Sequence, residues 1–335
     1  MAVHLKDISE LHSVSGNEGK IREYIKSNIK ADEIFTDTMG NLVALVKGKS
    51  SEKKLAVVTH MDESGFIVSD FTDKGYVKFK NAGNIEPRTL ISKRVVINES
   101  VQGIIGMKAI HLQTADERKN VVKIKDLFID IGAKDKDEAK QLVNKGDYIT
   151  FDTEFMEIGD KVKGKALDRA GIYCVCKAMD KTPVYDTYFV FTVQKEIGSR
   201  GAMIISHRLG VDFAVLVDTI ESADMYGAEN KNAVIGGGAV ISYSDRRMIC
   251  DKALNDRVFA LANEKGIKVQ KKTSAKGEGE YAMQYGNGAK KCISINIPVR
   301  YANTPVELMS LADIKSVTLL LEIILNGENT DGIIE

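Results

Sequence analysis

Helical and strand-like patterns of hydrophobic residues alternate in the first part of the chain. After Ser15, apolar side chains recur at the spacing of one face of an amphipathic helix. These positions are Ile21, Tyr24, Ile25 and Ile29. Residues 41–46 and 55–59 are instead short apolar runs rich in β-branched residues, which are typical of buried strands. The chain therefore opens as an α/β protein.

The pattern changes between about residues 65 and 151. Short strand-like segments are separated there by glycine and polar turns, and no long helical period is visible. The expected strands are residues 66–68, 76–79, 94–97 and 103–106. We interpret this region as a small β-rich insert.

Helix and strand patterns return after Ala166, which indicates that the first domain resumes. The expected helices are residues 171–179 and 202–209, and the expected strands are residues 188–193 and 213–217. Ser310 and Asp313 have capping-box spacing and should begin a final helix that packs against the sheet. The predicted domains are a discontinuous α/β domain of residues 1–66 and 161–335 and an inserted β-rich domain of residues 67–160.

Composition narrows the class of protein. The 335 residues are 44% hydrophobic and 28% charged, enough for one large core and a smaller second domain. Lys plus Arg and Asp plus Glu both number 47, so no net field favours nucleic acid or an anionic membrane as a partner. The first residues lack the apolar stretch of a signal peptide, and we expect a cytoplasmic protein. The four cysteines are too few for a disulfide scaffold and are interpreted as core thiols.

Four residues with metal-binding side chains follow predicted strands or the turns after them. They are His60, Asp168, Glu196 and Asp218. Open α/β sheets place ligands just beyond the carboxyl ends of their strands, so these distant segments can meet at one edge. One imidazole and several carboxylates suit divalent ions, and a carboxylate can bridge two of them. A single strand-end acid is more often a helix cap or a surface charge, so the prediction depends on the whole set.

Several motifs give the chain a resemblance to a known family across nearly its whole length. They are Ser15-Gly16-Asn17-Glu18, Gly40-Asn41-Leu42, residues 60–66 (His-Met-Asp-Glu-Ser-Gly-Phe), His111-Leu112-Gln113, residues 126–133, residues 165–169, residues 196–202 and residues 297–301. With these motifs the chain resembles the deblocking or glutamyl aminopeptidases that form tetrahedral assemblies, which are dinuclear metallopeptidases. The resemblance implies a three-layer zinc-exopeptidase-like α/β domain with an inserted β-barrel-like dimerisation domain, and hence a homo-oligomer.

The resemblance also implies roles for the candidate residues. His60 and Asp218 would bind one zinc or cobalt ion, Glu196 would bind the other, and Asp168 would bridge them. Asp62 would orient the His60 imidazole through its carboxylate.

Two departures from the family pattern change the expected chemistry. Lys195 stands where the family has its catalytic glutamate, and a protonated lysine cannot accept a proton. Asn303 stands where the second metal has its histidine, and a neutral amide oxygen is a poor zinc ligand. An ammonium about 5 Å from a divalent ion repels it by roughly 6 kcal/mol at an effective dielectric constant near 20.

We therefore expect one ion per chain rather than two, or none, with Lys195 occupying or neutralising the place of the second. In the alternative, Lys195 turns toward solvent and the pocket has simply lost its function. Asp62 or Glu63 would have to replace the missing general base.

Three functions follow from these expectations. The first is a metal-dependent aminopeptidase-like hydrolase, impaired or working with a single metal, that removes N-terminal residues from peptides. The second is a non-catalytic relative that binds a peptide or small ligand, or joins an active paralogue through the insert. The third is a glycosidase, supported only by acid pairs in a chain without tryptophan.

Overall fold

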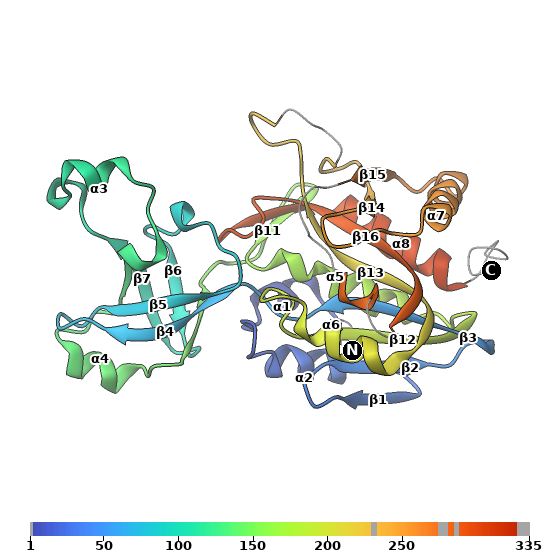
Figure 1. The fold of residues 1–335 in the computed structure, drawn as a ribbon, viewed down its shortest axis with the longest axis horizontal. Helices are drawn as coiled ribbons and strands as arrows, with labels where there is room; N and C mark the ends of the chain where they lie inside the picture. Colours follow the sequence, from blue (N-terminus) through green and yellow to red (C-terminus); the bar gives the residue numbers. More distant parts are fainter. Residues whose placement is uncertain (1–2, 229–232, 274–280, 285–287, 327–335) are drawn as a thin grey trace.

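The computed structural model describes residues 3–228, 233–273, 281–284 and 288–326. It consists of a large lobe built on a mixed sheet and a small lobe that projects from it (Figure 1). The sheet has 11 strands, and its main path runs β1-β2-β12-β3-β13-β16-β17-β11-β10, with β14 joining β16 and β15 joining β14. In the small lobe, six strands close into a barrel in the order β4-β5-β8-β7-β6-β9.

The strands of the large sheet come from both ends of the sequence. They are β1 (Glu33–Thr36), β2 (Leu42–Val46), β3 (Ser50–His60), β10 (Met156–Ile158), β11 (Lys161–Gly164), β12 (Tyr185–Thr192), β13 (Val211–Glu221), β14 (Ala239–Ser244), β15 (Val269–Thr273), β16 (Ala289–Arg300) and β17 (Glu307–Ser310). The central strands β12, β3, β13 and β16 are parallel. Their carboxyl ends therefore meet at one edge, as expected from the sequence.

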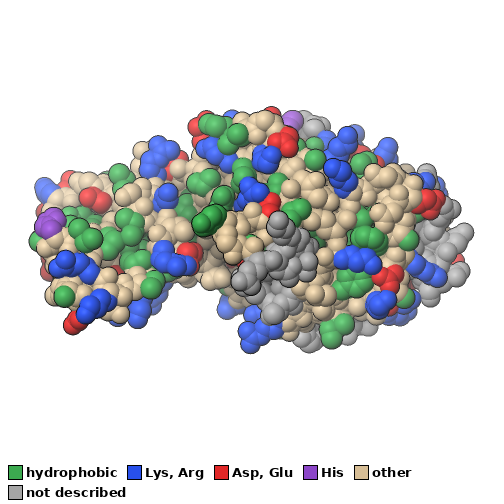
Figure 2. Space-filling model, turned by 90° about the horizontal axis from the view of Figure 1, so that it is seen from above, with side chains coloured by type: hydrophobic (Ala, Val, Ile, Leu, Met, Phe, Trp, Pro, Cys, Tyr) green, Lys and Arg blue, Asp and Glu red, His purple; other side chains and the backbone are tan. Residues whose placement is uncertain are grey.

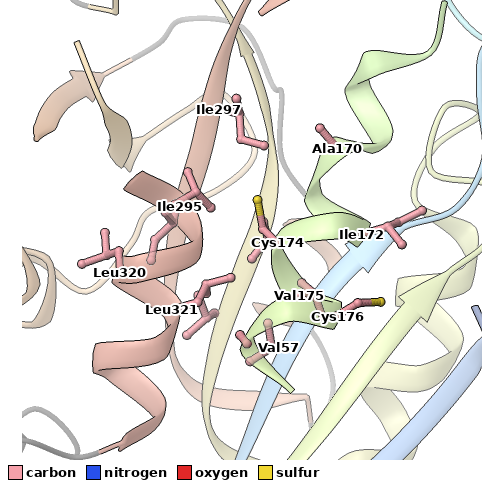
Figure 3. Packing of buried hydrophobic residues seen from close by; sticks show 14 of the residues in the cluster. Val57, Ala170, Ile172, Cys174, Val175, Cys176, Ile295, Ile297, Leu320 and Leu321 are labelled. Atoms are coloured by element: carbon pink, nitrogen blue, oxygen red, sulfur yellow. The ribbon is translucent and has the colours of Figure 1, made fainter. Parts of the chain in front are cut away.

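Helices cover both faces of this sheet and make it the middle layer of three. Those of the large lobe are α1 (Leu5–Glu10), α2 (Gly19–Asn28), α5 (Ala170–Ala178), α6 (Arg200–Leu209), α7 (Lys252–Glu264) and α8 (Leu311–Asn326). Because successive strand residues point to opposite faces, Val57 packs in the cluster under α5 and α8, whereas Ala56 and Val58 pack with Ile205 of α6. Figure 3 shows α5 and α8 against β16 and β3. The predicted three-layer α/β fold is confirmed.

The barrel has a hydrophobic core of its own. Its elements are β4 (Gly65–Phe71), β5 (Val77–Ala82), β6 (Arg94–Ile97), β7 (Val101–Met107), β8 (Leu127–Asp130) and β9 (Tyr148–Phe151), with α3 (Ala115–Lys119) and α4 (Lys136–Leu142) beside them. At its centre Phe66 packs edge-on against Phe79 and Phe151. Strand β10 belongs to the large sheet rather than to the barrel. We therefore propose that the insert ends near residue 152 instead of residue 160.

The final helix begins where the sequence predicts it, but the predicted capping box between Ser310 and Asp313 is wrong. Ser310 Oγ accepts the N–H of Ala312. The Asp313 carboxylate accepts the N–H groups of Gly236 and Gly238, at 2.7 Å each, and does not reach back to Ser310. The carboxylate of Asp313 therefore binds the loop of Gly236 and Gly238, which is distant in sequence, instead of the start of its own helix.

Charged side chains of both signs are mixed on the face of the molecule drawn in Figure 2, and the cysteines are buried. On the face drawn in Figure 2, basic and acidic side chains are scattered together over both lobes. All four cysteines are buried and free, as expected. Within the described ranges, no helix has the length and apolar character needed to cross a bilayer.

An ion pair fastens the segment after β13 to the end of β16. The Asp224 carboxylate accepts Arg300 Nε at 2.9 Å and Nη2 at 2.6 Å, and these hydrogen bonds lower the pKa of Asp224 to about 2. Because this pKa is lower in the folded chain than in the unfolded one, the stabilisation is complete above about pH 4 and is lost as the pH falls toward 2. We expect Arg300→Gln to lower the thermal unfolding midpoint at pH 6 and to lower it by a smaller amount at pH 2.5, where part of the stabilisation is already lost. An equal loss at both pH values would contradict this assignment.

Candidate functional site

Strand register places the first two candidate residues side by side. His60, the last residue of β3, pairs with Thr192 of β12, and Val58 pairs with Leu216 of β13. His60 and Asp218 each lie two residues beyond that second pair, so they are level and point to the same face. Their side chains meet, with His60 Nε2 3.4 Å from Asp218 Oδ1.

The other two candidates come from turns after the sheet. Asp168 lies in the 3-10 turn η4 (Leu167–Arg169) before α5, and Glu196 lies between β12 and α6. Ligand atoms of His60, Asp168 and Glu196 all lie within 4.8 Å of one another. The predicted convergence of an imidazole and three carboxylates therefore occurs.

The hydrogen bonds of His60 leave one ring nitrogen facing the acids. Nδ1 lies 3.0 Å from the backbone oxygen of Asp62, so it carries the proton and donates to that carbonyl. The Asp62 carboxylate, expected to orient the ring, is 3.6 Å from Nδ1 at its Oδ1. Nε2 is buried and has no hydrogen-bond partner among the residues that the structure describes. Burial and Lys195 lower the pKa of His60, but the carboxylates of Asp218 and Asp62 hold it well above its usual value.

The Asp62 carboxylate instead holds the chain after β12 in place. It accepts the backbone N–H of Lys195 at 2.9 Å and that of Glu196 at 3.0 Å, and it accepts the Ser15 hydroxyl at 2.5 Å. Asp62 is fully buried. Its role in this geometry is to aim residues 195 and 196 into the site.

Lys195 turns inward, contrary to the alternative of a solvent-facing lysine. Its Nζ lies 3.0 Å from Glu196 Oε1 and 3.2 Å from Asp218 Oδ2, and its side chain is 15% exposed. Burial lowers the pKa of Lys195, but the carboxylates of Asp218, Glu196 and Asp168 outweigh it and raise the pKa well above the usual value. The ammonium is therefore protonated and cannot serve as a base.

The two acids considered as substitute bases are also engaged. Asp62 accepts the three hydrogen bonds described above. Glu63 is 1% exposed, accepts the N–H of Ser13 at 2.9 Å and forms an ion pair with Lys165. Burial raises the pKa of Glu63, but the charges of Lys165 and Arg169 lower it overall. Neither carboxylate is free to take a proton from a water molecule.

Glu307 is a site residue that the sequence analysis missed. Its carboxylate accepts the N–H of Asp168 and that of Asn303, both at 3.1 Å, and so joins the turn before α5 to the loop before β17. Burial and the neighbouring Asp168 raise the pKa of Glu307 well above its usual value. Burial, with the Glu196 carboxylate adding to it, also raises the pKa of Asp168 to about 7. No motif in the sequence indicated this fourth carboxyl group.

Asn303 lies at the rim of the site. It is exposed, and together with Asp168, Ser64 and Glu307 it lines a cavity of about 20 Å³, which is room for about one water molecule. The Ser64 hydroxyl, also missed from the sequence, donates to Glu196 Oε2 at 2.6 Å. Asn303 thus lies beside the candidate metal ligands, as the resemblance implies. Its side chain offers a metal only a neutral amide oxygen.

Backbone strain is concentrated around the site. Five of the eight non-glycine residues with positive φ among those described flank it: Ala166, Gln194, Ser199, Tyr301 and Asn303. Such conformations cost roughly 1–3 kcal/mol each and persist where the surroundings determine them, often at functional sites.

Comparisons with known proteins agree with this geometry. The sequence profile of the M42 glutamyl aminopeptidase family matches residues 40–320. This chain belongs to that family. One relative is an aminopeptidase by name, from Acetivibrio thermocellus. It is 36% identical over 323 residues, which cover 95% of this chain and 96% of the relative.

Solved structures of other peptidases have the same fold. An aminopeptidase from Desulfurococcus kamchatkensis superposes with a TM-score of 0.91 at 28% identity, covering 96% of this chain and 93% of the other. The TET1 peptidase of Pyrococcus horikoshii, which assembles into a tetrahedron or a large octahedral shell, has a TM-score of 0.85 at 28% identity, with 96% and 98% covered.

Members of the M42 family are metal-dependent, and the residues present here fit a divalent ion. With no proton on Nε2, the His60 nitrogen and the Asp218 oxygen 3.4 Å from it would both be acceptors, so either a proton, which the raised pKa of His60 favours, or a cation lies between them. Asp168 Oδ1 is likewise buried and accepts no hydrogen bond within the described part of the chain. Imidazole nitrogen and carboxylate oxygens are a donor set that zinc accepts.

Proposed function

We propose that this M42 family member is a metal-dependent aminopeptidase-like hydrolase that binds one divalent ion, zinc or cobalt, in place of two. His60, Asp168 and Asp218 would hold the ion. The ammonium of Lys195 would take the place of the second ion between Glu196 and Asp218. The observation that carries the proposal is the position of Lys195 Nζ, 3.0 Å from Glu196 and 3.2 Å from Asp218.

Charge balance supports this arrangement. Two divalent ions would neutralise the acids of the family site, whereas here an internal monovalent cation already pairs with two of them. Both oxygens of Glu196 are also in use, one with Ser64 and one with Lys195. A second ion would have to displace the ammonium and would gain only a weak ligand at Asn303.

The chemistry expected from this site is peptide hydrolysis at a low rate. A bound divalent ion would polarise the substrate carbonyl and lower the pKa of a coordinated water. The residues of the chain bind and orient: the free amine of a peptide would bind near the carboxylates that surround the ion. No free base stands at residue 195, and a positioned base contributes about 10²- to 10⁴-fold to the rate.

The engaged state of Asp62 and Glu63 favours a second candidate, a non-catalytic family member that binds a peptide or small ligand or partners an active paralogue. A glycosidase has less support. The ligand atoms of His60, Asp168 and Glu196 lie within 4.8 Å of one another, whereas glycosidase carboxyl groups are about 5–5.5 or 6.5–9.5 Å apart. We also propose that the protein is a homo-oligomer assembled through the barrel and is cytoplasmic.

Metal analysis and a substrate panel test the proposal. Protein purified without chelator is expected to hold about one zinc or cobalt per chain, and His60→Ala is expected to hold almost none, because it loses the only imidazole of the set. Elemental analysis measures the metal, and a panel of aminoacyl anilides measures turnover. One ion with slow, chelator-sensitive turnover supports the hydrolase, one ion or none without turnover supports the non-catalytic candidate, and two ions would contradict the role of Lys195.

A further inference from the structure

The chain crosses between the two lobes twice, and one buried ion pair joins the crossings. Glu63 lies just before β4, where the chain enters the barrel, and Lys165 lies just after β11, where it has returned. Lys165 Nζ is 3.3 Å from both carboxylate oxygens of Glu63. The same ammonium donates to the hydroxyl of Thr150, in β9 of the barrel, at 2.8 Å. Glu63 and Lys165 are 1% and 2% exposed.

Each partner is a near neighbour of candidate metal ligands in the sequence. Glu63 follows Asp62 and lies three residues after His60, and Lys165 lies three residues before Asp168. Glu63 is also tied to Ser13 by two further contacts, since its carboxylate accepts the Ser13 N–H and its own N–H donates to the Ser13 carbonyl. The ion pair thus joins the two segments that present His60 and Asp168.

The two residues between Lys165 and Asp168, Ala166 and Leu167, explain why the Lys165–Glu63 ion pair matters for the position of Asp168. Ala166 has φ 49° and ψ 37°, a left-handed conformation that costs an alanine roughly 1–2 kcal/mol. It is held from one side by Lys165, whose ammonium pairs with Glu63 and whose carbonyl accepts the Ser9 hydroxyl at 2.6 Å. From the other side Glu307 accepts the N–H of Asp168. If the ion pair of Lys165 is removed, the backbone at Ala166 can leave its strained conformation, and Asp168 then moves with it.

We propose that Lys165 is a positioning residue for the metal centre. Its ammonium fastens both lobe crossings and the barrel at Thr150, and thereby holds the strained turn that aims Asp168 at His60. The prediction for metal affinity rests on the proposed function, whereas the positioning of the turn does not.

Metal binding and backbone exchange together test the inference. Lys165→Met is expected to weaken zinc binding about 10- to 100-fold, the usual effect of removing a group that orients a metal ligand. Glu63→Gln should act in the same direction, and Thr150→Val more weakly, because it removes only one acceptor. In the metal-free proteins, hydrogen–deuterium exchange of the peptide covering residues 163–171 should rise in the same order.

Two further variants separate positioning from general stability. Lys20→Met is the matched control, because Lys20 also pairs across the lobes, with Glu99, but stands far from the crossings in sequence and is exposed. It should change neither readout. In the Lys165→Met background, Ala166→Gly should recover part of the zinc affinity, because glycine adopts the left-handed conformation without strain. The visible spectrum of the cobalt-loaded protein should shift in Lys165→Met and not in Lys20→Met.

The outcomes are distinct. Weaker zinc binding and faster exchange of residues 163–171 in Lys165→Met, with Lys20→Met unchanged, support the inference. Unchanged exchange of that peptide overturns it, whatever the metal does. If the wild-type chain binds no zinc but the exchange changes as expected, the proposed function fails and the positioning role stands.

Discussion

The double substitution Lys195→Glu with Asn303→His is expected to raise the metal content from about one ion per chain to about two, and to raise aminoacyl-anilide hydrolysis by about 10²- to 10⁴-fold. The first change removes a repulsion of roughly 6 kcal/mol against a second divalent ion and supplies a carboxylate that can accept a proton. The second supplies an imidazole nitrogen, which zinc prefers to an amide oxygen. Position 303 has φ 60°, and histidine is among the residues that tolerate this region.

Single variants separate the effect of the charge at position 195 from the effect of the ligand at position 303. Lys195→Met removes the positive charge without adding a base, so it should raise metal content but leave the rate low. Asn303→His alone should have little effect, because Lys195 still pairs with Glu196 and Asp218. A double variant with wild-type metal content would show that Lys195 does not stand in for an ion.

Arg169→Met is expected to destabilise the fold by about 3–5 kcal/mol. Arg169 is fully buried beneath the site. Its guanidinium donates to the carbonyls of Ser9 and Leu11, at 3.1 and 2.8 Å, and to the hydroxyl of Ser13. Removing it leaves these buried acceptors unsatisfied and takes a positive charge away from Glu63.

The thermal unfolding midpoint of the metal-free protein measures this effect. The control is Arg88→Met, which removes an exposed arginine that pairs with Glu86 of its own turn in the barrel. Exposed pairs contribute about 0–1 kcal/mol, so this midpoint should stay close to that of the wild type. If the two variants melt at the same temperature, the buried hydrogen bonds of Arg169 do not hold the N-terminal segment.

Much of the architecture was predictable because it follows from local patterns. The helix expected at residues 171–179 is α5, and the strand expected at residues 213–217 lies within β13. Continuous apolar runs such as residues 55–59 become central strands because both faces of the sheet are covered. The barrel was visible in the sequence as a change of period. The place of β10 in the large sheet was not visible, because its short alternating pattern resembles that of the barrel strands.

The candidate site was predictable in part. His60 and Asp218 could be placed together because the carboxyl ends of parallel strands share an edge. The hydrogen bond from His60 to the backbone of Asp62, in place of its carboxylate, could not be foreseen, because residue identity does not say which oxygen faces the ring. Glu307 was missed for a related reason: its partners, Asp168 and Asn303, are brought to it only by the packing of β17 beside β11 and β16.

The sequence by itself determined the periodicities that build an α/β domain with a β-rich insert, and the types of side chain at the strand ends, including a lysine where a base was expected. Only the tertiary structure decided where that lysine points and which carboxylate oxygens, among the described residues, lack a hydrogen-bond partner. The physical reason is range: hydrophobic periodicity acts over neighbouring residues, whereas the direction of a buried charge depends on opposite charges brought near it by strands far apart in the chain.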